Sequence, residues 1–357
     1  MRFSYAHIPA YPLDESIKLI KVADELGYYA AYACDETWWK DMWLLFAAAA
    51  RETKQIRLGP NVTHVILRDP AHIVQMLGTL DELSGGRAEC VVSSGNQSLL
   101  PQHGIDLTAL KPLSRVIEAH EVMRSLLDTG AVAHAGPFFN YPGLWTLSRP
   151  VQKRLPIKLG AMGGPRSFRL AGEKFDGLHH ALGYTRGNFE YVMENLRAGA
   201  ESAGRDWREL DLAAWVVWAC AEDSAAAKET ARIMVAFYLA AMPESQLQRH
   251  GISGSDLKPI LDAFDAGDRQ KAVDLTSPEL GEMLSISGTP EECLAKLQRD
   301  ILPTGINHIV AGVVDPHLVK VLANRTVPNG VDAATQLQLI HDRVMPGLAA
   351  IGAELPA

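Results

Sequence analysis

The feature of this chain that most limits its fold is a repeated alternation of short β-rich runs with amphipathic helical segments. Runs rich in Val, Ile and aromatic residues recur, and segments with apolar residues three and four positions apart follow them. This alternation is typical of a parallel sheet whose strands are joined by crossover helices. The predicted strands lie at residues 2–8, 28–34, 56–65, 88–93, 156–161, 177–181, 212–221 and 306–314.

Helix boundaries also leave signals in the sequence. We expect Asp14 to cap a first helix at residues 14–26 and Gly27 to follow its end. The segment Thr289-Pro290-Glu291-Glu292 predicts a helix start, with an N-cap, a proline in the first position and two acids at the positive end of the dipole.

The pattern favours a closed (β/α)8 TIM barrel over an open doubly wound sheet, because helices separate nearly all of the strands. A dinucleotide-binding sheet would place G-x-G-x-x-G directly after its first strand. Here the chain from His7 to Pro12 contains no glycine. We predict a single barrel domain over residues 1–357, with a hairpin or lid insertion near 130–155 and a polar helical insertion near 240–285.

Charge and composition exclude several partners. The formal net charge is −8 and there is no basic tract, so we expect no nucleic acid. The start of the chain lacks a signal-peptide pattern, and the longest apolar run, residues 42–50, is shorter than the roughly 20 residues of a membrane helix. The four cysteines are widely spaced. We therefore expect a reduced cytoplasmic protein that does not bind membranes.

In a (β/α)8 barrel the active site lies at the carboxyl ends of the strands. Asp35 and Glu36 follow the second predicted strand and precede Trp38 and Trp39. Adjacent carboxylates are often only a solvated helix start. Here the tryptophans could wall a planar ring, and an acid with a pKa raised by burial could transfer a proton.

Two glycine-containing strand ends are further candidates. Gly59-Pro60 inside the third strand indicates either a plain barrel bulge or a close approach of the backbone to a ligand. The turn Gly160-Ala161-Met162-Gly163-Gly164 leads into a helix, which makes an anion site with Arg166 as a charge partner, unless the glycines serve turn geometry alone. Four histidines fall at strand ends, but no H-x-H or H-x-x-x-H spacing occurs, so we predict no metal site.

Longer motifs carry a family resemblance. Residues 58–63 (Leu-Gly-Pro-Asn-Val-Thr), 69–71 (Asp-Pro-Ala) and 79–87 (Thr-Leu-Asp-Glu-Leu-Ser-Gly-Gly-Arg) resemble the luciferase-like monooxygenase superfamily in order and spacing. Gly163-Gly164-Pro165 and residues 288–292 (Gly-Thr-Pro-Glu-Glu) add to the match, which spans about residues 1–320. The Gly-Pro-x-Val-Thr form and Lys111-Pro112 are most similar to the branch that uses coenzyme F420, an 8-hydroxy-5-deazaflavin, and includes methylenetetrahydromethanopterin reductases.

The resemblance implies a site for this coenzyme. It implies a non-prolyl cis peptide at Asn61-Val62 behind the ring, with Asp35 nearby. The cofactor-binding residues implied are Asp35, Asn61, Val62, Thr63, Ser94, Gly95, Asn96, Met162, Gly163 and Gly164.

Two positions depart from the family's usual pattern. Glu36 stands where the family often has histidine, and Asn96 stands where it often has an acid. We therefore predict Glu36 as the catalytic proton donor, with His7 as the second choice and solvent as the remaining source of the proton. The family commonly forms homodimers, and the apolar segment 42–50 fits such an interface.

The implied function is an F420-dependent oxidoreductase that moves a hydride between the deazaflavin and a small organic substrate. The alternatives are a two-component FMN-dependent monooxygenase and a non-catalytic binding protein on the same fold.

Overall fold

The computed structural model describes residues 1–352, with side chains described up to residue 348. The chain forms two compact units. The first unit comprises Met1–Ala6, Ala161–Lys174 and the chain from Leu178 onward, and the second comprises His7–Gly160 and Phe175–Gly177. The expected single domain over residues 1–357 stays a prediction, and its last five residues lie outside the described part.

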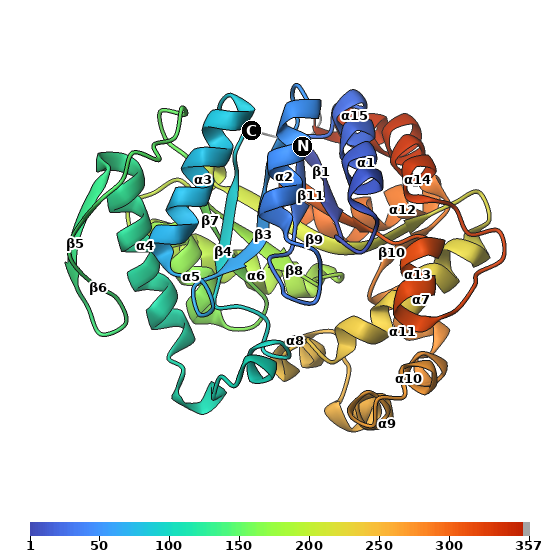
Figure 1. The fold of residues 1–357 in the computed structure, drawn as a ribbon. Helices are drawn as coiled ribbons and strands as arrows, with labels where there is room; N and C mark the ends of the chain where they lie inside the picture. Colours follow the sequence, from blue (N-terminus) through green and yellow to red (C-terminus); the bar gives the residue numbers. More distant parts are fainter. Residues whose placement is uncertain (353–357) are drawn as a thin grey trace. The chain divides into compact units, whose positions relative to one another are not determined.

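The second unit is a parallel sheet flanked by helices (Figure 1). Its strands are β2 (Ala30–Ala33), β3 (Arg57–His64), β4 (Cys90–Ser93) and most of β7 (Ile157–Ala161), paired in that order. Its helices are α1 (Leu13–Glu25), α2 (Met42–Glu52), α3 (Pro70–Ser84), η1 (Leu100–His103), η2 (Leu107–Ala109) and α4 (Pro112–Thr129). The expected hairpin near 130–155 is present as the antiparallel pair β5 (Ala131–Ala135) and β6 (Asn140–Trp145).

The first unit contains the remaining parallel strands. These are β1 (Arg2–His7, its last residue in the second unit), β8 (Gly177–Ala181, its first residue in the second unit), β9 (Asp211–Cys220), β10 (Ile286–Gly288) and β11 (His308–Val313), and β11 lies between β1 and β9. Its helices up to residue 275 are α5 (Pro165–Lys174), α6 (Arg186–Ser202), η3 (Trp207–Glu209), α7 (Ser224–Leu239), α8 (Glu244–Arg249), α9 (Gly254–Asp265) and α10 (Arg269–Leu275). Those that follow are α11 (Pro278–Met283), α12 (Pro290–Lys296), η4 (Leu297–Ile301), η5 (Leu302–Thr304), α13 (Pro316–Ala323), α14 (Ala333–Leu339), η6 (Ile340–Val344) and α15 (Met345–Gly352).

The predicted fold class is confirmed. All eight predicted strands are present, as β1, β2, β3, β4, β7, β8, β9 and β11, and helices alternate with them as in a (β/α)8 barrel. Among the described residues, no helix has the combination of length and apolar character that a membrane span requires.

The helix ends agree with the sequence at one predicted start and differ at another. Thr289 and Glu292 form a reciprocal capping box at the start of α12, as the Thr-Pro-Glu-Glu segment predicted. The predicted Asp14 cap is wrong, because α1 begins at Leu13 after Pro12 and Asp14 lies inside its first turn. Gly27, with φ of +75°, follows the end of this helix as expected.

The run Thr79–Arg87 links neighbouring elements of the second unit. Its Ser84-Gly85-Gly86 turn needs glycine because Gly85 and Gly86 have φ of +71° and +88°. The Arg87 guanidinium donates to the carbonyl oxygens of Ala50 at 2.9 Å and Ile56 at 2.7 Å, which fastens the end of α2 to the start of β3. This motif therefore stabilises the sheet beside the amino end of β4.

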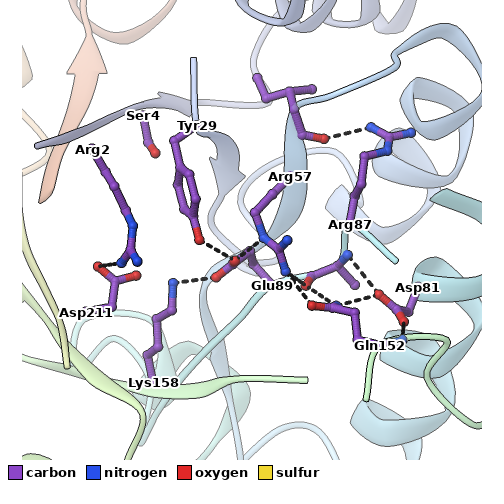
Figure 2. A network of polar contacts seen from close by, with 12 residues as sticks. Arg2, Ser4, Tyr29, Arg57, Asp81, Arg87, Glu89, Gln152, Lys158 and Asp211 are labelled. Carbon is purple, nitrogen blue, oxygen red and sulfur yellow. Dashed lines mark hydrogen bonds and ion pairs between the residues drawn. The ribbon is translucent and has the colours of Figure 1, made fainter. Parts of the chain in front are cut away.

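A buried polar network lies at the amino ends of β3, β4 and β7 (Figure 2). The fully buried carboxylate of Glu89 accepts hydrogen bonds from Arg57 Nε, Lys158 Nζ and, at 3.0 Å, the Tyr29 hydroxyl. Asp81, also buried, accepts from the backbone of Ala88 at 3.0 Å. The negative charge of Glu89 thus lies against the positive charges of Arg57 and Lys158 within the second unit.

Candidate active site

Three strand ends of the second unit are joined by polar contacts. After β2, the Asp35 backbone N–H donates to the Val62 carbonyl on β3 at 3.1 Å. The Thr63 hydroxyl donates to Asp35 Oδ2 at 2.8 Å, and Asn96 Nδ2, after β4, donates to Glu36 Oε1 at 2.9 Å. These residues, predicted from strand ends that are distant in sequence, therefore lie together at the carboxyl ends of neighbouring strands.

The β3 end carries the implied bulge. The register of β3 against β4 shifts between Asn61 and Thr63, and the Asn61-Val62 peptide is cis, as the resemblance implied. On β7, a Cβ atom added to Gly160 would lie 2.3 Å from Val62 Cγ1, so the bulged side chain fits only against a glycine. Asn61 and Val62 are partly exposed, whereas Thr63 is buried.

The Asp35 carboxylate is fully engaged by the protein. It is 6% exposed and receives a two-pronged contact from Arg68, with Nε 2.6 Å from Oδ2 and Nη2 2.7 Å from Oδ1. Trp43 Nε1 on α2 adds a third donor at 3.0 Å. The hydrogen bond to Asp35 raises the pKa of Arg68. Asp35 is thus placed to hold segments together rather than to move a proton.

Glu36 has the electrostatics of a proton donor. Burial raises the pKa of its carboxyl, and the neighbouring Asp35 charge acts in the same direction. Hydrogen bonds from Asn96 and from Trp39 Nε1, the latter at 3.1 Å, partly oppose this rise in pKa. A carboxyl with a raised pKa holds its proton closer to neutral pH, where it can act as a general acid.

His7 is placed differently. It is buried and stacks on Tyr11 with ring centroids 5.4 Å apart. Burial, with the nearby Lys40 charge, lowers the pKa of His7 to about 3. Its imidazole is therefore neutral at physiological pH, which favours Glu36 over His7 as the acid.

The turn after β4, at Ser94-Gly95-Asn96, exposes backbone that a ligand could contact. Gly95 has φ of +100°, a conformation that favours glycine, and an added Cβ would make a tight contact 3.1 Å from His64 Cβ. The Gly95 N–H donates to Ser93 Oγ at 3.0 Å. Ser94 and Asn96 are partly exposed beside it. A ligand can therefore approach this backbone closely.

The Met162-Gly163-Gly164 turn lies in the first unit and leads into α5. The Gly163 carbonyl accepts from Arg249 Nη2 at 3.3 Å and from Ser245 Oγ at 3.4 Å, both on α8. Arg166, the charge partner expected from sequence, is exposed. Sequence reasoning missed Arg249, because its proximity arises from the fold of the 240–285 segment.

Sequence spacing also missed a buried cluster in the first unit. His179, Asp211 and His308 offer potential metal-ligand atoms within 4.8 Å of one another. His308 contacts Asp211 Oδ1 through Nδ1 at 2.8 Å and Ser4 Oγ through Nε2 at 2.7 Å, and Arg2 pairs with the same Asp211 at 3.2 Å. These contacts engage both nitrogens of His308 and offset the Asp211 charge, so the cluster is already a hydrogen-bonded network.

These features define a (β/α)8-barrel protein with its candidate site at the strand carboxyl ends. Residues 2–308 match the family model described as luciferase-like monooxygenase. The chain belongs to this family, which confirms the resemblance predicted from its motifs.

Individual relatives match over nearly the whole chain. The chain is 30% identical over 352 residues to the 5,10-methylenetetrahydromethanopterin reductase of Archaeoglobus fulgidus, covering 98% of this chain and 100% of that protein. It superposes on the coenzyme F420-dependent tetrahydromethanopterin reductase from Methanopyrus kandleri with a TM-score of 0.86 and 27% identity, covering 97% and 98% of the two chains. An F420-dependent secondary alcohol dehydrogenase in complex with an F420-acetone adduct shares the fold, with a TM-score of 0.79, 20% identity and coverage of 97% and 98%.

Proposed function

We propose that this protein is a coenzyme F420-dependent oxidoreductase that transfers a hydride between the deazaflavin and a small organic substrate. The end-to-end similarity to a methylenetetrahydromethanopterin reductase is the observation that carries the proposal. The chemistry of the strand-end residues supports it, because hydride addition to a C=C, C=N or C=O bond leaves a charge that an acid must quench. Glu36, with its raised pKa, is such an acid.

The residues present fit a flat, anionic coenzyme. In our proposal, Asn61, Val62 and Thr63 support one face of the ring beside Asp35, and the bare backbone at Gly95 accepts close approach between Ser94 and Asn96. Met162, Gly163 and Gly164 bind the anionic tail, since their turn leads into the positive end of α5. When bound, the deazaflavin supplies or accepts the hydride, while Glu36 holds the proton at its carboxyl.

Coenzyme binding tests the function directly. Equilibrium titrations with oxidised and reduced F420, FMN and FAD should show F420 binding at least about tenfold more tightly than the flavins, a difference of about 1.4 kcal/mol. Preferential binding of FMN would instead indicate the two-component monooxygenase. Failure of the folded protein to bind any of the three would indicate a non-catalytic binding protein.

The glycine turn gives a test of the tail site. Gly163→Asp should weaken F420 binding by about tenfold or more, because a carboxylate would stand where the anionic tail binds. A Cβ at this position would lie 3.3 Å from Pro243 Cγ, so Gly163→Ala is the matched control for the added carbon. Unchanged affinity in Gly163→Asp, measured by titration, would place the tail elsewhere.

We also propose a homodimer in the cytoplasm. Segment 42–50 offers less of an interface than its sequence suggests, because Met42, Trp43, Leu45 and Phe46 on α2 are buried within the chain itself; Leu44 on the same helix is 73% exposed. Trp145 and Leu147, at and just after the end of the hairpin, are 71% and 84% exposed, which adds apolar surface to the same unit.

Light scattering at micromolar protein should give about twice the mass of 38.9 kDa that the sequence specifies. Leu147→Asp, but not the control Leu107→Asp at a less exposed apolar site, should shift the mass toward the monomer. A wild-type mass near 38.9 kDa would rule the dimer out.

A further inference from the structure

We propose that Arg68 is a positioning residue of the coenzyme site, which acts through Asp35 to fix the β3 bulge at Asn61–Thr63 against the end of β2. The inference rests on the proposed function and assigns a role to a residue that sequence motifs did not single out. Arg68 lies between β3 and α3, five residues beyond Thr63, and its side chain is 30% exposed.

The contacts run from Arg68 through one carboxylate to the bulge. Arg68 grips both oxygens of Asp35 at 2.6 and 2.7 Å. Asp35 in turn accepts from the Thr63 hydroxyl at 2.8 Å and donates its backbone N–H to the Val62 carbonyl at 3.1 Å. Both bulge contacts therefore depend on where the Asp35 residue is held.

The same carboxylate ties in the next helix. Trp43 Nε1 donates to Asp35 at 3.0 Å, and Arg68 Nη2 also lies 3.4 Å from Asp41, whose carboxylate caps α2 by accepting from Leu44 N–H at 2.9 Å. Arg68 thus connects the ends of β2 and β3 with the start of α2. The ends of β2 and β3 and the start of α2, which border the candidate site, are therefore all connected through the Arg68 guanidinium.

A planar guanidinium is needed for this geometry. A buried carboxylate is costly unless a cation and hydrogen bonds compensate it, and the Arg fork matches both of its oxygens at once. A lysine at this position would restore the charge with a single point contact. Loss of both charge and fork would leave Asp35 buried with only the neutral donors Thr63 and Trp43.

This role differs from that of Glu36. Glu36 receives its hydrogen bonds from Asn96 and Trp39, which are different donors from those around Asp35. Disturbing Arg68 should therefore act first on the coenzyme's support and show in the dissociation constant. Disturbing Glu36 should show in turnover.

The test is a double-mutant cycle read by equilibrium titration with F420. Arg68→Met should raise the Kd for F420 by about tenfold or more, because the β3 bulge that supports the ring would lose the group that fixes it through Asp35. Arg68→Lys should fall between wild type and Arg68→Met. In an Asp35→Asn background, Arg68→Met should change the Kd by less than about twofold, because the residue through which Arg68 acts is already altered.

The controls separate this inference from the proposed function. Lys21→Met removes an exposed cation that pairs with Glu52 at 3.1 Å and should leave the Kd unchanged. If wild type does not bind F420, the proposed function fails. If wild type binds and Arg68→Met binds equally well, the inference alone is overturned. Should Arg68→Met not fold, as judged by circular dichroism, the folded Arg68→Lys variant decides, and an unchanged Kd in it would overturn the inference.

Discussion

Glu36→Gln should lower turnover by about 100-fold or more while leaving the Kd for F420 within about twofold of the wild-type value. Glutamine keeps the size of the side chain and its single oxygen can still accept from Asn96 or from Trp39, but it carries no acidic proton. Steady-state kinetics and coenzyme titration on the same preparation measure the two quantities.

The pH profile gives a second readout of the same group. In our proposal Glu36 acts in its protonated form, so the wild-type rate should fall as pH rises through its raised pKa. The glutamine variant should lose that limb of the profile. His7→Asn is the parallel control, since a histidine with a pKa of about 3 is already neutral and should not supply the proton.

Two outcomes would change this assignment. Full turnover in Glu36→Gln with loss of activity in His7→Asn would exchange the two roles. Full turnover in both variants would mean that solvent supplies the proton, and that the strand-end residues serve to position the substrate.

The largest effect on stability should come from Glu89→Gln, with a loss of about 3–5 kcal/mol in the free energy of unfolding. The substitution removes the carboxylate that pairs with both Arg57 and Lys158, and Lys158 is only 2% exposed. A buried ammonium without its counter-ion is the costly species, rather than the lost hydrogen bonds. Denaturant unfolding followed by circular dichroism measures the difference.

Matched variants sharpen that test. Glu52→Gln removes the carboxylate of an exposed ion pair with Lys21 and should cost less than about 1 kcal/mol. Combining Glu89→Leu with Lys158→Met should recover much of the lost stability, because apolar residues of similar volume replace a buried ion pair at small cost. A loss below about 1 kcal/mol for Glu89→Gln would show that Lys158 is compensated by other groups.

The strands could be predicted from the sequence because buried parallel strands consist of short, continuous runs of apolar residues. The strand that was missed, β10, has only three residues, too few to give a period. The Asp14 cap was misplaced because the N-cap of α1 is Pro12, two residues earlier, without a side-chain cap. Local propensity sets the element, whereas its boundary depends on tertiary contacts.

Some residues of the candidate site could likewise be predicted from the sequence, and others could not. Glu36, Thr63 and Asn96 could be grouped from sequence, because the barrel rule brings successive strand ends together. Arg68 could not be assigned to Asp35, which lies 33 positions away, because no period links them. The cluster of His179, Asp211 and His308 likewise comes from three strands whose spacing in sequence carries no ligand pattern.

The position of the run Thr79–Arg87 has a consequence for how such proteins diversify. One of the motifs that make this chain recognisable, with Asp81 and Arg87, clamps the sheet beside the amino end of β4, while Glu36 and Asn96 occupy carboxyl ends. This motif therefore serves the stability of the sheet, and the proposed proton donor lies away from it at the carboxyl ends of the strands. If the proposed site is right, substitutions at Glu36 and Asn96 should change the reaction while leaving this clamp, and the stability it provides, untouched.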